Sequence, residues 1–204
     1  MKAATTGNTL SNAAGNKCDI ILAATLSLLA NRGFHGFSIR DVAKEAGVAT
    51  GTVYLYFEDR EDLIKKLHSQ IIDTVGREVF SVPDQQSSLY QQFHSMCWNF
   101  WRLFKLQPDI ILSKGQFDHL PLDLLHSRHE EAKVVLEPLF TFFLRGREQR
   151  ALKDFPDEIL FSLAFEPYFE IARKSLQGFV VVDDEMLEQI IRASWDSIAV
   201  RIEG

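Results

Sequence analysis

Residues 47–63 read GVATGTVYLYFEDREDL. This stretch predicts a short helix at residues 49–56, directly before a better capped helix at residues 60–80. The short helix contains poor helix formers. Gly51 costs roughly 1 kcal/mol relative to alanine, and the β-branched and aromatic residues cost a few tenths each. A helix this weak in isolation must be held by its neighbours.

Three small or apolar residues stand at fixed spacing around this helix: Ala43, Gly47 and Val53. Two helices that cross steeply through a tight turn need a small side chain where they touch. They also need a turn residue that tolerates positive φ, and an apolar residue that faces back to the core. The three residues meet these demands in order. The spacing therefore predicts a helix-turn-helix, with residues 39–46 as its first helix and 49–56 as its recognition helix.

The composition of the short helix suits contact with DNA. Gly51 lets the backbone approach the major groove, threonines offer hydroxyl and methyl groups, and tyrosines can donate to phosphates. Arg60 lies at the first turn of the next helix, whose N-terminus also favours phosphate. We expect DNA contacts from these positions: Ser38, Arg40, Ala49, Thr50, Gly51, Thr52, Tyr54, Tyr56 and Arg60.

Residues 17–63 resemble the DNA-binding domain of the TetR/AcrR family of transcriptional repressors. The resemblance rests on Ala30-x-x-Gly33-Phe34, Phe37-Ser38-Ile39-Arg40-Asp41-Val42-Ala43, Ala46-Gly47-Val48, Gly51-Thr52-Val53-Tyr54-x-Tyr56-Phe57 and Asp59-Arg60-Glu61-Asp62-Leu63. The sequence departs from the family at three of these positions. Ala49 replaces a frequent capping serine, and Thr50 and Arg60 replace frequent lysines, so we expect specificity to depend more on base and shape readout.

Charge and composition limit the function classes. The 204-residue chain has a net charge of −6, but residues 16–60 are neutral, with five basic and five acidic groups. Any DNA contact should come from this segment, and non-specific affinity should be weak. The longest apolar run, residues 20–30, is too short to span a membrane, and residues 1–15 lack a signal peptide. Two distant cysteines fit a reduced cytoplasmic protein.

The helix signals predict an all-α fold with two domains. Residues 1–15 are expected to be a disordered tail, 16–62 a three-helix helix-turn-helix domain, and 63–204 a helical bundle for ligand binding and dimerisation. Capping residues and hydrophobic periodicity place helices at residues 17–32, 39–46, 60–80, from near 87, 130–146, 156–177 with a kink at Pro167, and 185–202. Only Val180–Val182 has the pattern of a strand.

The family resemblance implies a homodimer with an interface near the C-terminus, and a ligand cavity among the middle helices. The apolar stripe of helix 185–202 gives the expected dimer interface: Leu187, Ile191, Ser194, Trp195 and Ile198. Burial of the same stripe in the core of one chain is the open alternative. Surplus aromatic residues give the expected walls for an apolar or aromatic ligand: Phe93, Cys97, Phe100, Trp101, Phe104, Phe117, Phe143, Phe161, Phe165 and Tyr168.

An enzyme is the weaker interpretation. His126 and His129, with Asp118, His119, Asp123 and Glu130 nearby, could ligate a sensory metal or form a solvated helix face. No nucleophile-elbow or P-loop motif occurs, so we expect no catalytic residues, cofactor or metal. Cys97 is expected to be an inert buried thiol or, alternatively, an oxidant sensor. The sequence thus predicts a cytoplasmic, ligand-responsive repressor with double-stranded operator DNA as its partner and no membrane association. The alternative is a helical small-molecule or metal sensor without a role in transcription.

Overall fold

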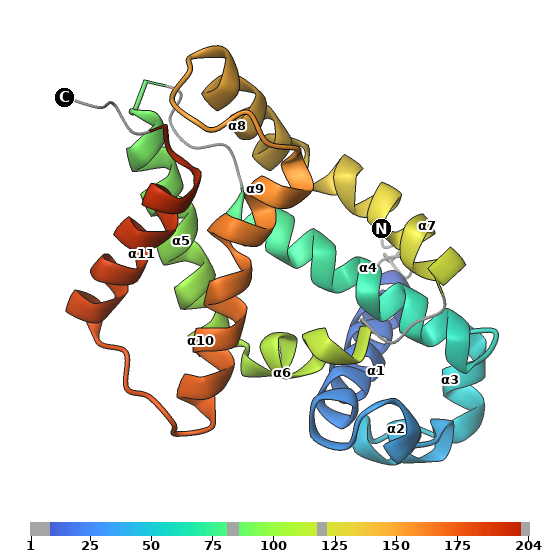
Figure 1. Ribbon diagram of the computed structural model, residues 1–204. Helices are drawn as coiled ribbons and strands as arrows, with labels where there is room; N and C mark the ends of the chain where they lie inside the picture. Colours follow the sequence, from blue (N-terminus) through green and yellow to red (C-terminus); the bar gives the residue numbers. More distant parts are fainter. Residues whose placement is uncertain (1–8, 81–85, 118–121, 201–204) are drawn as a thin grey trace, which may run out of the picture. The chain divides into compact units, whose positions relative to one another are not determined.

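The predicted all-α fold is confirmed by a computed structural model (Figure 1). It describes residues 9–80, 86–117 and 122–200, and of residues 9–16 and 122–128 it describes the backbone alone. In these ranges the only β-type pairing is an isolated bridge between Leu152 and Ala199, and Val180–Val182 form no strand. The chain divides into two compact units: unit 1 holds residues 1–70 and 112–120, and unit 2 holds 71–111 and 121–204.

Unit 1 contains the predicted helix-turn-helix. Its elements are α1 (Thr9–Arg32), the 3₁₀ turn η1 (Phe34–Gly36), α2 (Ile39–Glu45), α3 (Thr50–Tyr56) and the first half of α4 (Arg60–Val79). Helix α2 begins with a capping box, in which Ser38 and Asp41 bond each other's backbone N–H groups. Helix α1 begins at Thr9, so two expectations are wrong: Asn16 is no cap, and residues 9–15 are not a disordered tail. Each residue added to an existing helix gains a hydrogen bond, and Ala13 and Ala14 favour the extension.

Unit 2 is built from helices packed around aromatic side chains. They are the second half of α4, α5 (Leu89–Leu106), the start of α6 (Pro108–Phe117), α7 (Leu122–Val135), α8 (Glu137–Glu148), α9 (Asp157–Ala164), α10 (Glu166–Leu176) and α11 (Asp184–Ile198). The expected helix at 130–146 is wrong, because the chain breaks at Leu136 and Pro138 occupies the first turn of α8. The kink expected at Pro167 is a full break, and Phe165 joins α9 to α10.

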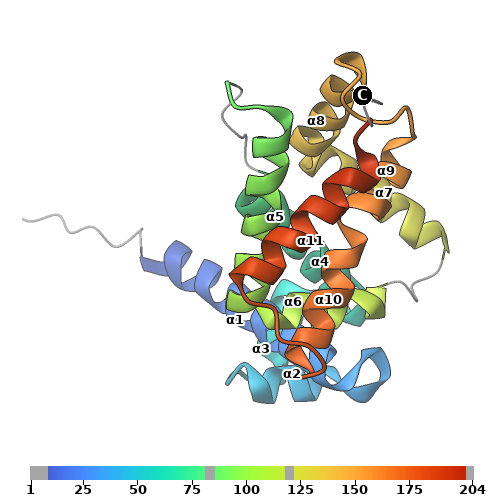
Figure 2. The same cartoon turned by 60° about the vertical axis from the view of Figure 1, so that its left-hand side comes forward.

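Helix α11 lies against α9 and α5 within unit 2 (Figure 2). Its last turn is tied down by hydrogen bonds: Ser197 Oγ donates to the Leu163 carbonyl at 3.2 Å, and Lys153 N donates to the Ile198 carbonyl at 2.8 Å. The segment that joins α10 to α11 has no regular structure. These contacts decide which face of α11 is buried and which remains at the surface.

Candidate DNA-binding surface and ligand-binding core

The crossing of α2 and α3 has the geometry that its spacing predicts. The side chains of Ala43 and Val53 are 2% and 0% exposed. Gly47 takes φ +65°, a value that L side chains rarely adopt, and Val48 N donates to the Ala43 carbonyl at 2.9 Å. The predicted helix-turn-helix is therefore confirmed in its local structure.

Helix α3 has one buried face and one exposed face. Val53 and, at the C-cap, Phe57 point into the core, whereas Tyr54 is 55% exposed. A Cβ at Gly51 would meet nothing within 4 Å, so packing in unit 1 does not require glycine there. The remaining predicted contact residues are exposed (Arg40 and Ala49) or half-buried (Thr50, Thr52 and Tyr56). Ala49 gives α3 no side-chain cap, as the departure from the family pattern suggests.

Two of the predicted contact residues are engaged within unit 1. Ser38 Oγ lies 2.6 Å from Asp41 Oδ2, and this bond holds the pKa of the Asp41 carboxyl below its usual range. The guanidinium of Arg60 donates to the Phe34 carbonyl and lies 4.9 Å from the centroid of the Phe37 ring. Both side chains therefore stabilise the domain, and fewer of their donors are available to a phosphate.

Leu55 is a candidate contact residue that the sequence reasoning missed. Its side chain is 81% exposed in the middle of α3. An exposed leucine on a recognition helix can contact a thymine methyl. The signal was present in the sequence, because position 55 lies on the face of α3 opposite the core residue Val53.

The aromatic residues of unit 2 pack on one another. The ring of Phe165 lies 5.4–5.6 Å from those of Phe80, Phe93, Phe100 and Phe161. Phe104 lies 5.2 Å from Phe100. These tilted and edge-to-face arrangements are favourable for aromatic pairs. The rings expected to wall a cavity thus fill much of this space themselves.

One residue of the expected ligand set lies in unit 1, and another lies on α8. Phe117 belongs to unit 1, where its ring packs edge-on against Phe34 at 5.9 Å and lies 4.9 Å from the His68 ring. Phe117 therefore packs within unit 1, whereas the other residues of the expected ligand set belong to unit 2. Phe143 is fully buried on α8 and contacts Phe142 at 5.8 Å. Aromatic composition could not separate Phe117 from the aromatic residues of unit 2, because its partners Phe34 and His68 are distant in sequence.

Cys97 and Tyr168 form a buried pair in the same core. Both side chains are fully buried, and burial raises the pKa of the Cys97 thiol to about 12. Burial also raises the pKa of Tyr168, whose hydroxyl lies beside Cys97 and Ser194. In the described residues, Tyr168 Oη has no hydrogen bond of good geometry. A thiol held protonated in this way is a poor nucleophile.

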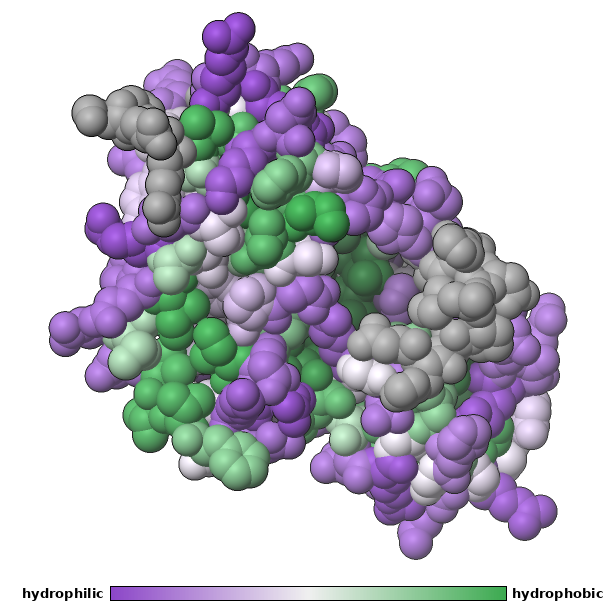
Figure 3. Space-filling view, viewed as in Figure 1, coloured by the Kyte–Doolittle hydropathy of each residue, from purple (hydrophilic) through white to green (hydrophobic). Residues whose placement is uncertain are grey.

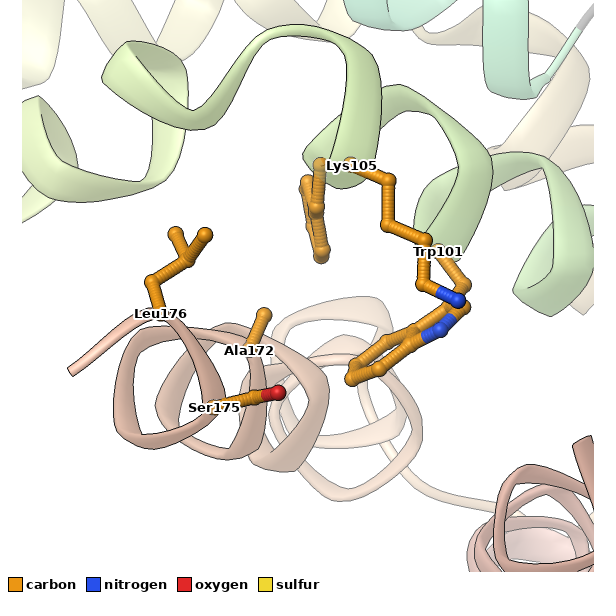
Figure 4. A pocket seen from close by; sticks show the side chains of 6 residues that line it. Trp101, Lys105, Ala172, Ser175 and Leu176 are labelled. Carbon is orange, nitrogen blue, oxygen red and sulfur yellow. The ribbon is translucent and has the colours of Figure 1, made fainter. Parts of the chain in front are cut away.

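A small pocket lies between α5 and α10 (Figure 4). Its volume is about 40 Å³, and its lining consists of Trp101, Phe104, Lys105, Ala172, Ser175 and Leu176. Trp101 and Phe104 belong to the expected ligand set, and the other four were not predicted. Trp101 Nε1 is buried and has no acceptor within the described parts of the chain.

Four of the five residues expected in the dimer interface are buried within the single chain. Leu187, Ile191 and Ile198 are 0% exposed, and Ser194 is 6% exposed, in the single chain. A partner cannot reach them, because they face the core of their own unit. Trp195 is half-buried against Phe93, with ring centroids 5.4 Å apart. The exposed residues of α11 lie on a different face.

Only some of the candidate metal ligands can be placed. Asp118 and His119 lie outside the described residues, and no side-chain position is described for Asp123 or His126. His129 is exposed, with Nε2 3.6 Å from Glu158 Oε1. No group of three potential metal ligands occurs among the residues whose side chains are described.

A helix-turn-helix followed by a helical bundle is typical of a class of DNA-binding regulators. Comparisons with known proteins support this class. Residues 21–67 match the family model of bacterial regulatory proteins, tetR family, and residues 88–199 match that of the tetracyclin repressor-like C-terminal domain. The chain belongs to the TetR family of transcriptional regulators. This is a class of regulators and not of enzymes, and on that ground the enzyme interpretation is set aside.

Individual relatives support this placement over nearly the whole chain. A TetR family protein of Vibrio parahaemolyticus is 32% identical, covering 91% of this chain and 100% of its own, with a TM-score of 0.79. An uncharacterized HTH-type transcriptional regulator of Haemophilus influenzae is 25% identical over 87% of this chain and 93% of its own. A TetR family regulator of Marinobacter aquaeolei, 23% identical over 92% and 97%, shares the fold with a TM-score of 0.83.

None of the helices in the described ranges is both long enough and apolar enough to cross a membrane.

Proposed function

We propose that this chain is a cytoplasmic repressor that binds palindromic operator DNA as a homodimer and releases it when a small apolar or aromatic inducer binds. The DNA-binding part of this proposal is supported by the exposed face of α3. Gly51, Tyr54 and Leu55 are exposed there, and the buried Val53 anchors the helix to the core. This face would enter the major groove. Arg40 and the half-buried Thr50, Thr52 and Tyr56 would flank it, while Ser38 and Arg60 would mainly hold the domain in shape.

The dimer would form through an exposed apolar face of α9 and α11, which we call the α9–α11 face. It consists of Ile159, Leu163, Met186, Ile190 and Ala193, which are exposed or half-buried. These α11 positions lie about a quarter turn around the helix from the buried stripe. Figure 3 shows further hydrophobic residues over the lower end of α11 and the segment that joins it to α10, where Phe179 and Val181 are exposed. An apolar face of this kind is typical of an interface, and the family favours a second copy of the chain.

The response to ligand would pass along α4 and α6, since the division between the units falls inside these two helices. In unit 1, Gln116 near the end of α6 accepts a hydrogen bond from Phe34 N at 3.3 Å. A ligand that displaces an aromatic side chain of the core of unit 2 would shift α5 and, through it, these helices. The spacing of the two recognition helices in the dimer would change, and operator affinity would fall.

The decisive experiment is selection of operator sequences from random DNA with the purified full chain, followed by footprinting on the DNA upstream of its own gene. We expect a palindromic site protected in two halves. The matched variants are Tyr54→Phe, which removes a phenolic hydroxyl from the exposed face, and Tyr90→Phe on α5, far outside the helix-turn-helix in sequence. Failure to enrich any sequence would reject the proposal in favour of a sensor that does not regulate transcription.

A further inference from the structure

The pocket between α5 and α10 contains two donors that no described acceptor satisfies. Trp101 Nε1 is buried without a partner, although native structures pair nearly all such groups. Lys105 Nζ lies 5.8 Å from the centroid of the Trp101 ring, and Lys105 forms no ion pair within the described chain. Figure 4 shows its amino group next to the indole nitrogen, with the Ser175 hydroxyl pointing into the same pocket. The lining contains no acidic residue.

We propose that this pocket binds the carboxylate of an aromatic or aliphatic carboxylic acid. The indole N–H and the ammonium group are donors only, so their ligand must supply acceptors. An ionised carboxylate is an acceptor-only group whose charge Lys105 balances. Its two oxygens match the indole N–H and the ammonium group, and the Ser175 hydroxyl adds a third donor. A phosphate ester would bring more charge than a single cation compensates.

The size of the pocket fits a head group and not a whole ligand. Its volume is about 40 Å³, whereas one water needs about 10–15 Å³ and a whole drug-sized ligand about 300–1,000 Å³. Phe104, Ala172 and Leu176 give an apolar wall for the first carbons of the tail. Leu176 is 44% exposed, so the tail can leave the pocket along the surface or displace an aromatic side chain of the core.

Lys105 also acts as the cover of the pocket. Its side chain is exposed and lies over the indole, so water does not reach Trp101 Nε1. Exposed side chains change rotamer within nanoseconds. The lysine can therefore swing out, admit the acid and then pair with the carboxylate that has taken the indole N–H.

The test is calorimetric titration of the full chain, without DNA, with octanoate and benzoate. Octanamide and benzamide keep the shape but lose the charge, and octyl phosphate changes the anion. Lys105→Met removes the ammonium group, and Arg102→Met is its matched control, because Arg102 is exposed one turn earlier on α5 but does not line the pocket. Both positions are at the surface, so neither change should unfold the protein.

We expect at least one acid to bind, with about tenfold or greater preference over its amide. Lys105→Met should remove this preference, and Arg102→Met should keep it. The indole N–H signal of Trp101, assigned with Trp101→Phe, should move in the ¹H–¹⁵N spectrum while those of Trp98 and Trp195 stay. Equal binding of acid and amide, tighter binding of octyl phosphate, equal losses in the two variants, or no binding of either acid would each overturn the proposal.

The proposal rests on the proposed function only where the acid is taken to be the inducer, and the two can fail separately. Operator binding by the ligand-free protein tests the DNA-binding half without reference to the pocket. An acid that binds with the expected selectivity but leaves the operator complex intact would keep the carboxylate site and reject its role in induction.

Discussion

The guanidinium of Arg60, at the first turn of α4, donates a hydrogen bond to the backbone carbonyl of Phe34, 26 positions earlier in the chain. It also lies over the ring of Phe37, 4.9 Å from the centroid. One side chain thus links the start of α4 to both ends of the segment between α1 and α2. The planar guanidinium has five N–H donors in a fixed geometry and also stacks on aromatic rings, which suits it to both contacts.

Arg60→Ala should therefore destabilise unit 1 more than it weakens phosphate binding. We expect a loss of about 1–2 kcal/mol in the free energy of unfolding, from a charged hydrogen bond and a cation–π contact. Arg40→Ala, at an exposed position of α2, should leave stability unchanged and reduce the salt dependence of operator binding by about one phosphate contact. Urea unfolding measures the change in stability, and operator titrations at several salt concentrations measure the change in salt dependence. A reduction of the salt dependence by about one phosphate contact in Arg60→Ala, with unchanged stability, would restore Arg60 as a phosphate contact.

Val53 and Leu55 lie on opposite faces of α3, so variants at these two positions distinguish core packing from DNA recognition. Val53 is 0% and Leu55 is 81% exposed. Val53→Ala should cost about 2 kcal/mol of stability by removing buried methyl groups. Leu55→Ala should change stability by less than about 0.5 kcal/mol and weaken operator binding, most strongly at sites with thymine. If Leu55→Ala left the selected operator sequence and its affinity unchanged, the exposed face of α3 would not be the reading surface.

The helix-turn-helix could be predicted because its signals are local. Ala43, Gly47 and Val53 lie within eleven consecutive positions, and each has a steric role that its residue type reveals. The buried face of α11 could not be predicted in the same way. Leu187 and Ile190 are both apolar, and only contact with α9 and α5 decides that the first is buried and the second half-exposed. The sequence indicated an amphipathic helix correctly but not the partner of each face.

A matched set of charged variants tests whether the α9–α11 face is the dimer interface. Ala193→Glu should give monomers in light scattering with an intact fold, because it places a charge in the proposed interface. Arg192→Glu, on a neighbouring exposed position, should remain dimeric. Ile191→Glu should instead unfold unit 2, at a cost of several kcal/mol, since that side chain is 0% exposed in its own chain. A dimeric Ala193→Glu protein would place the interface elsewhere.

Cys97 should not react with thiol reagents in the native protein. Burial raises the pKa of its thiol from 9.0 to about 12, whereas Cys18 is only partly buried. At pH 8 we expect rapid labelling of Cys18 alone, with Cys97 reacting after unfolding. Rapid native labelling of Cys97 would instead support a sensor of oxidants.

Because the pKa of the Cys97 thiol is raised in the folded state, the free energy of unfolding should fall as the pH becomes alkaline. The unfolded state loses the thiol proton above pH 9 while the folded state keeps it, so this stability is present below pH 9 and is lost toward pH 12. Cys97→Ala should flatten this decline in urea unfolding between pH 8 and 10. An equally steep decline in the variant would assign the effect to other groups.

Phe117 shows why the ligand site was harder to predict than the DNA-binding helix. Its residue type and neighbours in sequence match those of the aromatic core. Yet its partners Phe34 and His68 come from positions 83 and 49 residues earlier, and both lie in unit 1. Similarly, Lys105 and Ser175 gave no signal of a shared pocket, because their meeting depends on how α5 packs against α10. Residue type indicates the chemistry available to a site, but here tertiary packing decides which side chains meet.

A variant of Phe165 tests whether the core of unit 2 is solid. This residue joins α9 to α10 and contacts four aromatic rings. A ring facing an open cavity would cost little when removed, but this one is fully buried. We therefore expect Phe165→Ala to cost about 3–5 kcal/mol, as much as Phe57→Ala in unit 1. The space left behind is lined by aromatic residues, so it should stay dry and bind a small apolar compound such as benzene. Thermal unfolding with and without benzene would show this, with a rise in melting temperature for Phe165→Ala and none for the wild type. A loss well below that of Phe57→Ala, or an equal rise in both proteins, would mean that the core of unit 2 is already open to ligands.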